Sequence, residues 1–248
     1  MKAMVLAAGL GTRLRPLTDD RPKALVEVGG RTMLEITLAR LRDFGVREVV
    51  INAHHFADEL AEWLTAFGRS HQDSGMRLSI SREDVLLDTG GGLKQAAGFF
   101  AGDDEPFLLH NVDVLSAIDL GRMVAAHCAS GALATLAVQE RETSRYLLFD
   151  QNRLLCGRRS GRDGTPEMVR DAVPMQALAF CGIHVIAPRL LGMMTEQGAF
   201  SIIDVYLRLA AQGEQIAGFR ADKFYWRDLG KPESIAAAER ERSLWAAS

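Results

Sequence analysis

Cysteine is scarce in this sequence, and its few cysteines form no recognisable pattern. Cys128, Cys156 and Cys181 are an odd number, and none lies in a Cys-x-x-Cys pair. This spacing excludes a disulfide framework and a cysteine-based zinc site. We therefore expect buried, reduced thiols in a cytoplasmic protein.

The chain also lacks an excess of positive charge and a long hydrophobic run. Its 29 Lys and Arg against 32 Asp and Glu give a formal net charge of −3, which argues against a nucleic-acid partner. The apolar run from Met4 to Ala8 stops at Gly9 and is followed by Arg13, unlike a secretion signal. No stretch approaches the ~18 apolar residues of a membrane span. We expect neither a nucleic-acid nor a membrane partner, and the sequence leaves a homo-oligomer open.

Two well-known glycine loops are missing. A G-x-G-x-x-G dinucleotide fingerprint fails because Leu14 occupies the third glycine position after Gly9 and Gly11. A Walker A loop fails because no Gly-Lys-Ser or Gly-Lys-Thr occurs in the chain.

A different glycine loop is present near the start of the chain, in the segment MVLAAGLGTRLRPLTDDRPKAL from Met4 to Leu25. Glycines permit tight turns that expose backbone N–H groups. Such N–H groups, with Arg13 and Lys23 nearby, form a cradle for phosphate oxygens. The segment therefore predicts a ligand with several phosphates, whereas the alternative is a plain turn with solvated arginines.

Hydrophobic patterning predicts an α/β fold. Apolar residues recur at helical spacing from Met33 to Phe44, and Gly45 is a natural helix stop. Strands and helices alternate after this point, which is typical of a three-layer, Rossmann-like fold with a mainly parallel sheet and helices on both faces. The expected strands are Glu48–Asn52, Met76–Ser81, Pro106–His110, Leu133–Gln139, Tyr146–Asp150 and Ala177–Ile186. The further expected helices are Ala57–Phe67, a short one starting near Gly92, Ser201–Ala211 and Glu233–Leu244. The segment Gly157–Pro174 is expected to be a mobile hairpin or loop.

Several chemically distinctive residues follow predicted strands. The loop at Gly9, the run Gly90-Gly91-Gly92 and Asp113 all do so. Ligands of parallel sheets bind outside the carboxyl ends of the strands. We therefore expect these segments to meet at one edge of the sheet.

These motifs resemble a known family. The pattern L-A-A-G-x-G-T-R-L-x-P-L-T from Leu6 to Thr18, followed by Pro22-Lys23, is similar to the signature of sugar-1-phosphate nucleotidylyltransferases. The resemblance continues, in family order, through Asp88-Thr89-Gly90-Gly91-Gly92, Asn111-Val112-Asp113, Phe180-Cys181-Gly182-Ile183 and Trp226-Arg227-Asp228-Leu229-Gly230. It implies a single nucleotidyltransferase domain over residues 1–248, with a nucleotide-binding half to about 115 and a sugar-binding half from about 116.

The resemblance also implies roles for individual residues. Arg13 would clamp the β- and γ-phosphates, and Lys23 would lie between the α-phosphate and the sugar phosphate. Asp113 and Asp228 would hold one Mg²⁺, although each could instead cap a turn. The implied nucleotide contacts are Ala8, Gly9, Gly11, Thr12, Thr89, Gly90, Gly91, Gly92 and Asn111.

The sugar side departs from the family pattern. Val112 stands where many members have glycine, and the Glu-Lys-Pro motif of several hexose-specific members is absent. Arg141, Arg145 or Arg227 could supply the missing positive charge. The preferred sugar-binding residues are Arg145, Tyr146 and Gly182.

The expected reaction joins a nucleoside triphosphate to a sugar 1-phosphate and releases pyrophosphate. Uridylylation of N-acetylmuramate 1-phosphate and guanylylation of mannose or heptose 1-phosphate are both candidates, so base and sugar stay open. The alternatives are an enzyme for another phosphorylated alcohol, such as phosphocholine, and a non-catalytic nucleotide-sugar-sensing domain.

Overall fold

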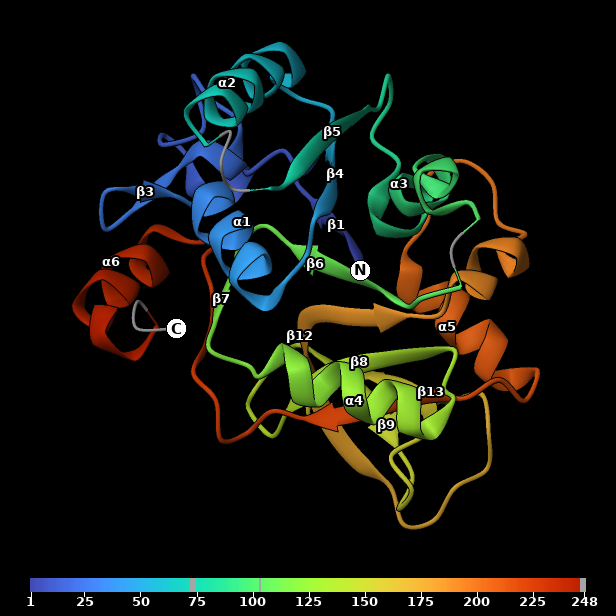
Figure 1. Ribbon diagram of the computed structural model, residues 1–248. Coiled ribbons are helices and arrows are strands. Elements are labelled where there is room, and N and C mark those ends of the chain that lie inside the picture. The colour runs from blue at the N-terminus through green and yellow to red at the C-terminus, as the bar shows by residue number, and fades with distance from the viewer. Residues whose placement is uncertain (72–74, 103, 246–248) are drawn as a thin grey trace.

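The computed structural model describes residues 1–71, 75–102 and 104–245, which fold around a 10-stranded sheet (Figure 1). The main path of the sheet runs β11 (Glu167–Met168), β10 (Leu155–Ser160), β9 (Arg145–Phe149), β12 (Gln176–Ile186), β6 (Phe107–Asn111), β1 (Lys2–Leu6), β4 (Glu48–Ala53) and β5 (Arg77–Arg82). Strand β8 (Ala134–Gln139) joins this path at β12 and carries β13 (Ile216–Arg220) on its other side.

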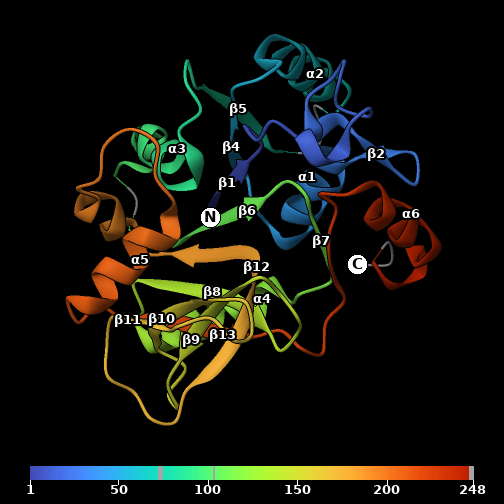
Figure 2. The same ribbon diagram turned by 180° about the vertical axis from the view of Figure 1, so that it is seen from behind.

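The two halves of the sheet differ in strand direction. Strands β6, β1, β4 and β5 are parallel, as the alternation of strands and helices predicts. The long strand β12 is antiparallel to β6, β8 and β9, and β9 and β10 form an antiparallel pair visible from behind in Figure 2. The parallel half therefore supplies a binding edge, and the antiparallel half extends the sheet beside it.

Helices cover both faces of the sheet, which confirms the three-layer prediction. Alternate residues of β1 enter different hydrophobic clusters, with Ala3 and Val5 on one face and Met4 on the other. The first cluster includes side chains of α1 (Met33–Phe44), α2 (Ala57–Ser70), α4 (Leu120–Ser130) and α6 (Pro232–Arg240). The second includes α3 (Asp88–Gln95) and α5 (Ile202–Ala211).

Local sequence signals account for the best-predicted helix. Helix α1 begins after Thr32, whose hydroxyl accepts a hydrogen bond from the Glu35 amide, and ends at Gly45 with φ of 103°. A side-chain oxygen at the first position and a left-handed glycine at the last satisfy backbone groups that the helix itself leaves open.

Two expectations need correction. The short helix begins at Asp88 rather than near Gly92, so the three glycines lie inside it. The hairpin expected within Gly157–Pro174 is present as the antiparallel pair β10–β11. Cys128 is exposed, whereas Cys156 and Cys181 are buried as expected.

Two further short elements matter for the site. Strands β7 (Val114–Ser116) and β14 (Trp226–Asp228) pair antiparallel beside the main sheet. A 3-10 turn, Thr12–Leu14, follows β1, and a second, Lys23–Leu25, precedes the small β2 (Glu27–Val28) and β3 (Arg31–Thr32) hairpin. None of the helices in the described ranges is long and apolar enough to span a membrane.

Candidate active site

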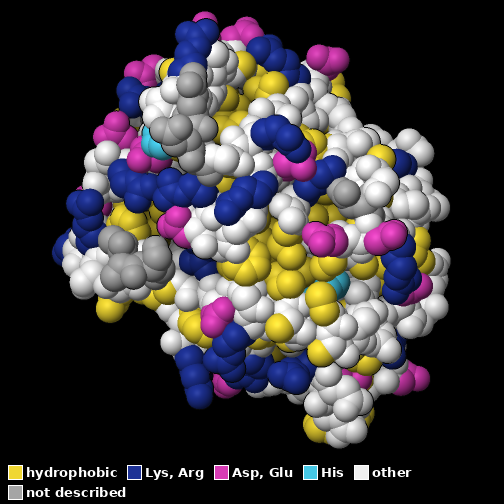
Figure 3. Space-filling view, in the orientation of Figure 1, with side chains coloured by type: hydrophobic (Ala, Val, Ile, Leu, Met, Phe, Trp, Pro, Cys, Tyr) yellow, Lys and Arg dark blue, Asp and Glu magenta, His cyan; other side chains and the backbone are white. Residues whose placement is uncertain are grey.

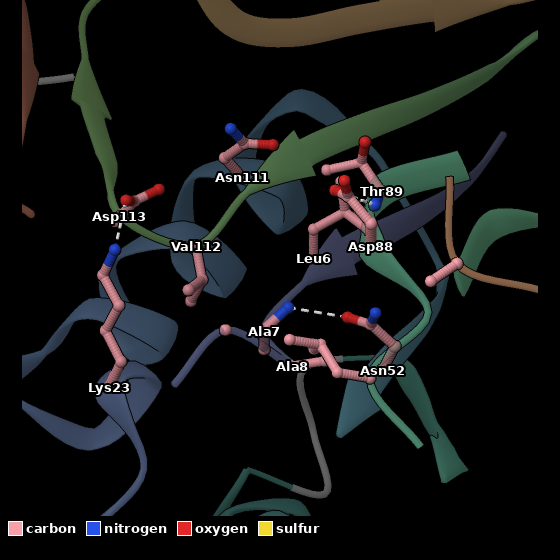
Figure 4. A pocket seen from close by; sticks show the side chains of 13 residues that line it. Leu6, Ala7, Ala8, Lys23, Asn52, Asp88, Thr89, Asn111, Val112 and Asp113 are labelled. Carbon is pink, nitrogen blue, oxygen red and sulfur yellow. Dashed lines mark hydrogen bonds and ion pairs between the residues drawn. The ribbon is translucent and has the colours of Figure 1, made fainter. Parts of the chain in front are cut away.

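Three parallel strands end together at one edge of the sheet. Leu6, the last residue of β1, pairs with Asn52 of β4 on one side and with Asn111 of β6 on the other. A cleft of about 350 Å³ opens at this edge (Figure 4). Gly9 and Asp113 line it as expected, whereas the run Gly90-Gly91-Gly92 is represented only by the preceding Asp88 and Thr89. The full lining is Leu6, Ala7, Ala8, Gly9, Lys23, Asn52, Leu86, Asp88, Thr89, Asn111, Val112, Asp113 and Ala199.

A buried polar network supports one wall of the cleft. The Ala7 amide donates to Asn52 Oδ1 over 2.7 Å, and Asn52 Nδ2 donates to Glu83 Oε1 over 2.6 Å. Glu83 also accepts from the Leu87 amide over 3.0 Å and is buried. The network fixes the chain after β1, β4 and β5 relative to one another. Sequence reasoning missed it, although a polar residue at the end of the apolar run EVVIN was a usable signal.

Gly9 and Gly11, in the first loop, are glycines for different structural reasons. Gly11 has φ of +65°, and a Cβ there would lie 2.9 Å from Thr18 Cγ2 and 3.2 Å from Lys23 Cβ. The loop therefore closes tightly on itself at Gly11. A Cβ at Gly9 would meet no protein atom within 4 Å, although Gly9 lines the cleft. Packing does not require glycine there, so its bare backbone is left to face a ligand.

Lys23 and Asp113 meet in the cleft. The Lys23 ammonium forms an ion pair with Asp113 Oδ2, drawn as a dashed line in Figure 4. Both side chains are largely shielded from water, with exposed fractions of 12% and 16%. The pair joins the end of the glycine loop to the residue that follows β6.

Arg13 and Asp228 both lie against Gly230, near this pair. A Cβ placed on Gly230 would lie 2.6 Å from Arg13 Nη2 and 2.7 Å from Asp228 Oδ1, so one methyl group would touch both side chains. Asp228 pairs with Val114 across β14 and β7, and the Leu229 amide donates to the Asp113 carbonyl over 2.8 Å. Two cations and two carboxylates from distant parts of the chain thus converge at one sheet edge.

The donor set at this position suits a hard divalent cation. Asp113 is held through Oδ2 by Lys23, and Asp228 is held through Oδ1 by the Gly230 amide at 2.8 Å. In the described part of the chain no three His, Cys, Asp or Glu side chains cluster as a complete metal cage. Mg²⁺ commonly binds through one or two carboxylates plus substrate phosphates and water, so a pair of aspartates fits it.

The glycines of α3 lie behind the cleft rather than on its surface. Thr89 lines the cleft, but Gly90, Gly91 and Gly92 are buried, and no atom of theirs is among its lining. A Cβ on Gly90 would lie 2.5 Å from the Phe200 ring, and one on Gly92 would lie 2.6 Å from Glu83 Oε1. Close packing against the segment before α5 and against the buried network therefore explains these glycines. A direct nucleotide contact by all three stays a prediction.

The side chain of Asn111 has a polar atom without a hydrogen-bond partner among the described residues. Its Oδ1 is buried and has no partner among the described residues, although Asn111 lines the cleft. A Cβ on Gly182, whose φ is +73°, would lie 2.9 Å from Asn111 Nδ2. Gly182 therefore lets β12 approach Asn111 closely, at the border between the expected nucleotide and sugar sides.

Arg141 is more enclosed by protein than Arg145. Its guanidinium stacks on the Trp226 ring at 3.7 Å and donates to the Phe180 carbonyl over 2.7 Å. Burial lowers the pKa of Arg141, and nearby Asp228 counteracts that shift in part. Arg145 is exposed at the start of β9, whereas Tyr146 is buried beside it.

The fold and the paired charges at the sheet edge define a nucleotidyltransferase. The sequence matches the family model described as Nucleotidyl transferase over residues 2–152, and the chain belongs to that family. It is 35% identical over 243 residues to an N-acetylmuramate alpha-1-phosphate uridylyltransferase of Caulobacter vibrioides, covering 96% of this chain and 95% of that protein. A mannose-1-phosphate guanyltransferase of Candida albicans is 28% identical over 241 residues, covering 95% of this chain but 62% of that protein. The chain is a sugar-1-phosphate nucleotidylyltransferase.

Solved structures share the fold at lower sequence identity. HddC from Yersinia pseudotuberculosis, complexed with GMP-PN, has a TM-score of 0.73 and 19% identity, covering 97% of this chain and 99% of that one. A UDP-glucose pyrophosphorylase from Acinetobacter has a TM-score of 0.78 and 17% identity, covering 98% of this chain and 93% of that one.

Proposed function

We propose that the protein transfers a uridylyl group from UTP to N-acetylmuramate 1-phosphate and releases pyrophosphate. The observation that carries this proposal is the 35% identity to the Caulobacter uridylyltransferase over nearly the whole of both chains. The guanyltransferase of Candida is less similar and extends well beyond the matched region. Guanylylation of mannose or heptose 1-phosphate is therefore the second candidate.

Charge neutralisation is the main task in this reaction. The attacking sugar phosphate is largely dianionic at neutral pH, since its second pKa is about 6. It needs no general base, but it must approach the α-phosphate of another polyanion. Lys23 is paired with Asp113, and Arg13 lies beside Gly230 with Asp228, so both cations stand near the aspartates. This supports the roles of clamping the triphosphate and bridging the two phosphates.

We propose that Asp113 and Asp228 hold Mg²⁺ beside the α-phosphate. The paired strands β7 and β14 support this assignment, because they bring the backbones of Asp113 and Asp228 side by side. The bound ion would supply neutralising charge for the reacting phosphates. The protein's own task is to orient both carboxylates, which it does through Lys23 and the Gly230 amide.

We propose Arg141, rather than Arg145, as the cation that binds the sugar substrate. Arg141 lies by Asp228, is held against Trp226, and has a buried Nε without a partner among the described residues. Arg159, 5.5 Å from the Tyr146 ring, also has a buried and unpartnered Nε. N-acetylmuramate carries a carboxylate as well as the phosphate, so two arginines with unpartnered buried donors suit an acidic sugar.

Pyrophosphate release with Mg²⁺ tests the proposal. UTP, GTP, CTP and dTTP are each combined with N-acetylmuramate, mannose, heptose and glucose 1-phosphates. The highest kcat/KM is expected for UTP with N-acetylmuramate 1-phosphate. A higher value for GTP with mannose or heptose 1-phosphate would replace the first candidate with the second. Turnover with phosphocholine alone, or with no pair, would contradict both. We also propose a cytoplasmic location, which the three free cysteines support.

A further inference from the structure

A second cavity, of about 210 Å³, lies against β6 and β7, the strands that flank Asp113. It is enclosed by α1, by the strands β6 and β7, and by Trp245 near the carboxyl end of the described chain. Arg40, His110 and Ser116 line it, and we call it the Arg40 cavity. None of these residues lines the active-site cleft.

The Arg40 cavity contains polar atoms that the protein leaves unsatisfied. His110 and Ser116 are 1% and 5% exposed, yet His110 Nε2 and Ser116 Oγ have no hydrogen-bond partner in the described chain. Arg40 donates through Nη2 to the Ile118 carbonyl, but its Nε and Nη1 are buried without partners there. Buried polar groups without partners are costly, so such a cluster in one cavity indicates a bound polar molecule.

The charge in the cavity is positive. Arg31, Arg40 and Arg42 line it against one acid, Asp43. Arg31 is paired with Glu35 and Arg42 with Asp43, which leaves Arg40 as the cation without an ion-pair partner among them. Asp119 lies near Arg40, but its carboxylate caps α4 by accepting from the Arg122 amide over 2.9 Å. Lys and Arg side chains also gather over the region of α1 on the face shown in Figure 3.

The protonation state of His110 limits which ligands the cavity can bind. Its Nδ1 lies 2.8 Å from the Asn111 carbonyl oxygen, which is only an acceptor, so Nδ1 carries the proton. Burial keeps the ring neutral at pH 7, since it lowers the His110 pKa to about 4. The free Nε2 is therefore an acceptor. The cavity offers donors from Arg40 and Ser116 together with one acceptor.

We propose that the Arg40 cavity binds a phosphate group with one protonated oxygen. Its charged oxygens accept from Arg40 and Ser116, and its P–OH donates to His110 Nε2. Sulfate has no proton to donate at neutral pH, so the His110 acceptor disfavours it. Inorganic phosphate keeps a P–OH at neutral pH, whereas a phosphate monoester is largely dianionic there and has no proton to donate, so the site favours inorganic phosphate. Because His110 and Ser116 belong to the strands on either side of Asp113, the bound group would stabilise that part of the site.

Thermal unfolding in phosphate tests this site without nucleotide or Mg²⁺. Inorganic phosphate, glycerol 3-phosphate and sulfate are compared at constant ionic strength. At ten times its Kd, inorganic phosphate should raise the Tm by about 3 to 6 °C. Glycerol 3-phosphate, largely dianionic at pH 7, and sulfate should each give a clearly smaller shift at the same concentration, because neither has a proton to donate to His110.

Matched variants separate this cavity from the active-site cleft, which also attracts phosphate. Arg40→Gln and Ser116→Ala should lose the phosphate shift. Ser116→Ala deletes only a hydroxyl, so it keeps the test valid if Arg40→Gln folds poorly. Arg13→Ala, in the cleft, and Arg69→Gln, on the exposed side of α2, should keep the shift. An undiminished shift in both Arg40→Gln and Ser116→Ala, no shift in the wild type, or an equal shift with sulfate overturns the proposal.

Discussion

Lys23 and Asp113, 90 residues apart in sequence, form an ion pair where the glycine loop meets the end of β6. Arg13 and Asp228 both lie against Gly230, near this pair. Lys23 is therefore held by Asp113, one of the two proposed metal-binding carboxylates, and the Gly230 amide holds the other, Asp228. These contacts orient both carboxylates in advance, which lowers the reorganisation that substrate binding requires.

Removing either member of the first pair should nearly abolish turnover. Lys23→Ala deletes a compact charge at the reacting phosphates, and Asp113→Ala deletes a proposed metal ligand. We expect kcat to fall by about 100- to 1,000-fold in each, the range for loss of one preorganised electrostatic group. Pyrophosphate release measures kcat, and circular dichroism checks the fold. The exposed Lys223→Ala is the matched control and should keep full activity. Near-normal turnover in both test variants would refute their assigned roles.

A methyl group at Gly230 should disturb catalysis more than folding. It would enter the space between Arg13 Nη2 and Asp228 Oδ1, at 2.6 and 2.7 Å, and push apart two side chains that need a fixed geometry. We expect Gly230→Ala to lower kcat/KM by about 10- to 100-fold, since small misplacements of catalytic groups have effects of this size. Gly192→Ala is the control, because a Cβ there meets nothing within 4 Å. Equal activity of the two variants would count against a functional Arg13–Asp228 contact.

Gly9 and Gly90 should respond to alanine in opposite ways. Gly9→Ala places a methyl in the cleft without touching protein, so it should raise the KM for the nucleotide several-fold and leave the Tm unchanged. Gly90→Ala would meet the Phe200 ring at 2.5 Å, and overpacking of this kind costs about 1 to 3 kcal/mol of stability. Thermal unfolding and initial-rate kinetics on both variants distinguish the two outcomes. A normal nucleotide KM in Gly9→Ala would remove that glycine from the nucleotide site.

Arg141 and Arg145 should differ in their effect on the sugar substrate. Arg141→Ala removes a cation stacked on Trp226 near Asp228, and we expect it to raise the KM for the sugar 1-phosphate by about 10- to 100-fold. The KM for the nucleotide should change little. Arg145→Ala, which removes an exposed side chain, should be close to wild type. The reverse ranking in initial-rate kinetics would restore Arg145 as the sugar-side cation.

Local signals in the sequence predicted the glycine loop and α1, because spacing and turn residues are local properties. They also predicted that Gly9 and Asp113 meet, because parallel strands share an edge, but the run at Gly90 lies behind the cleft rather than in its lining. The antiparallel half was not predicted, since the direction of β12 depends on its distant partners β6 and β8. The sequence also could not explain why position 90 is glycine. The sequence shows that a side chain is absent but not that Phe200, 110 positions later, occupies the space. The Arg141–Trp226 stack was missed for the same reason.

Acid should destabilise the fold through its buried histidines. Burial lowers the pKa of His184 to about 3 and that of His127 to about 4, whereas both titrate near 6.5 once unfolded. Their contribution to stability is therefore complete above pH 6.5 and is lost as the pH falls toward 4, because the unfolded chain takes up the protons first. Each such histidine contributes a slope of about 1.4 kcal/mol per pH unit in this window. Urea unfolding at pH 4.5, 5.5 and 6.5 should show a shallower slope for His184→Gln by about this amount. His55→Gln, on the surface, should keep the wild-type slope, and an unchanged slope in His184→Gln would show that His184 is not the group responsible.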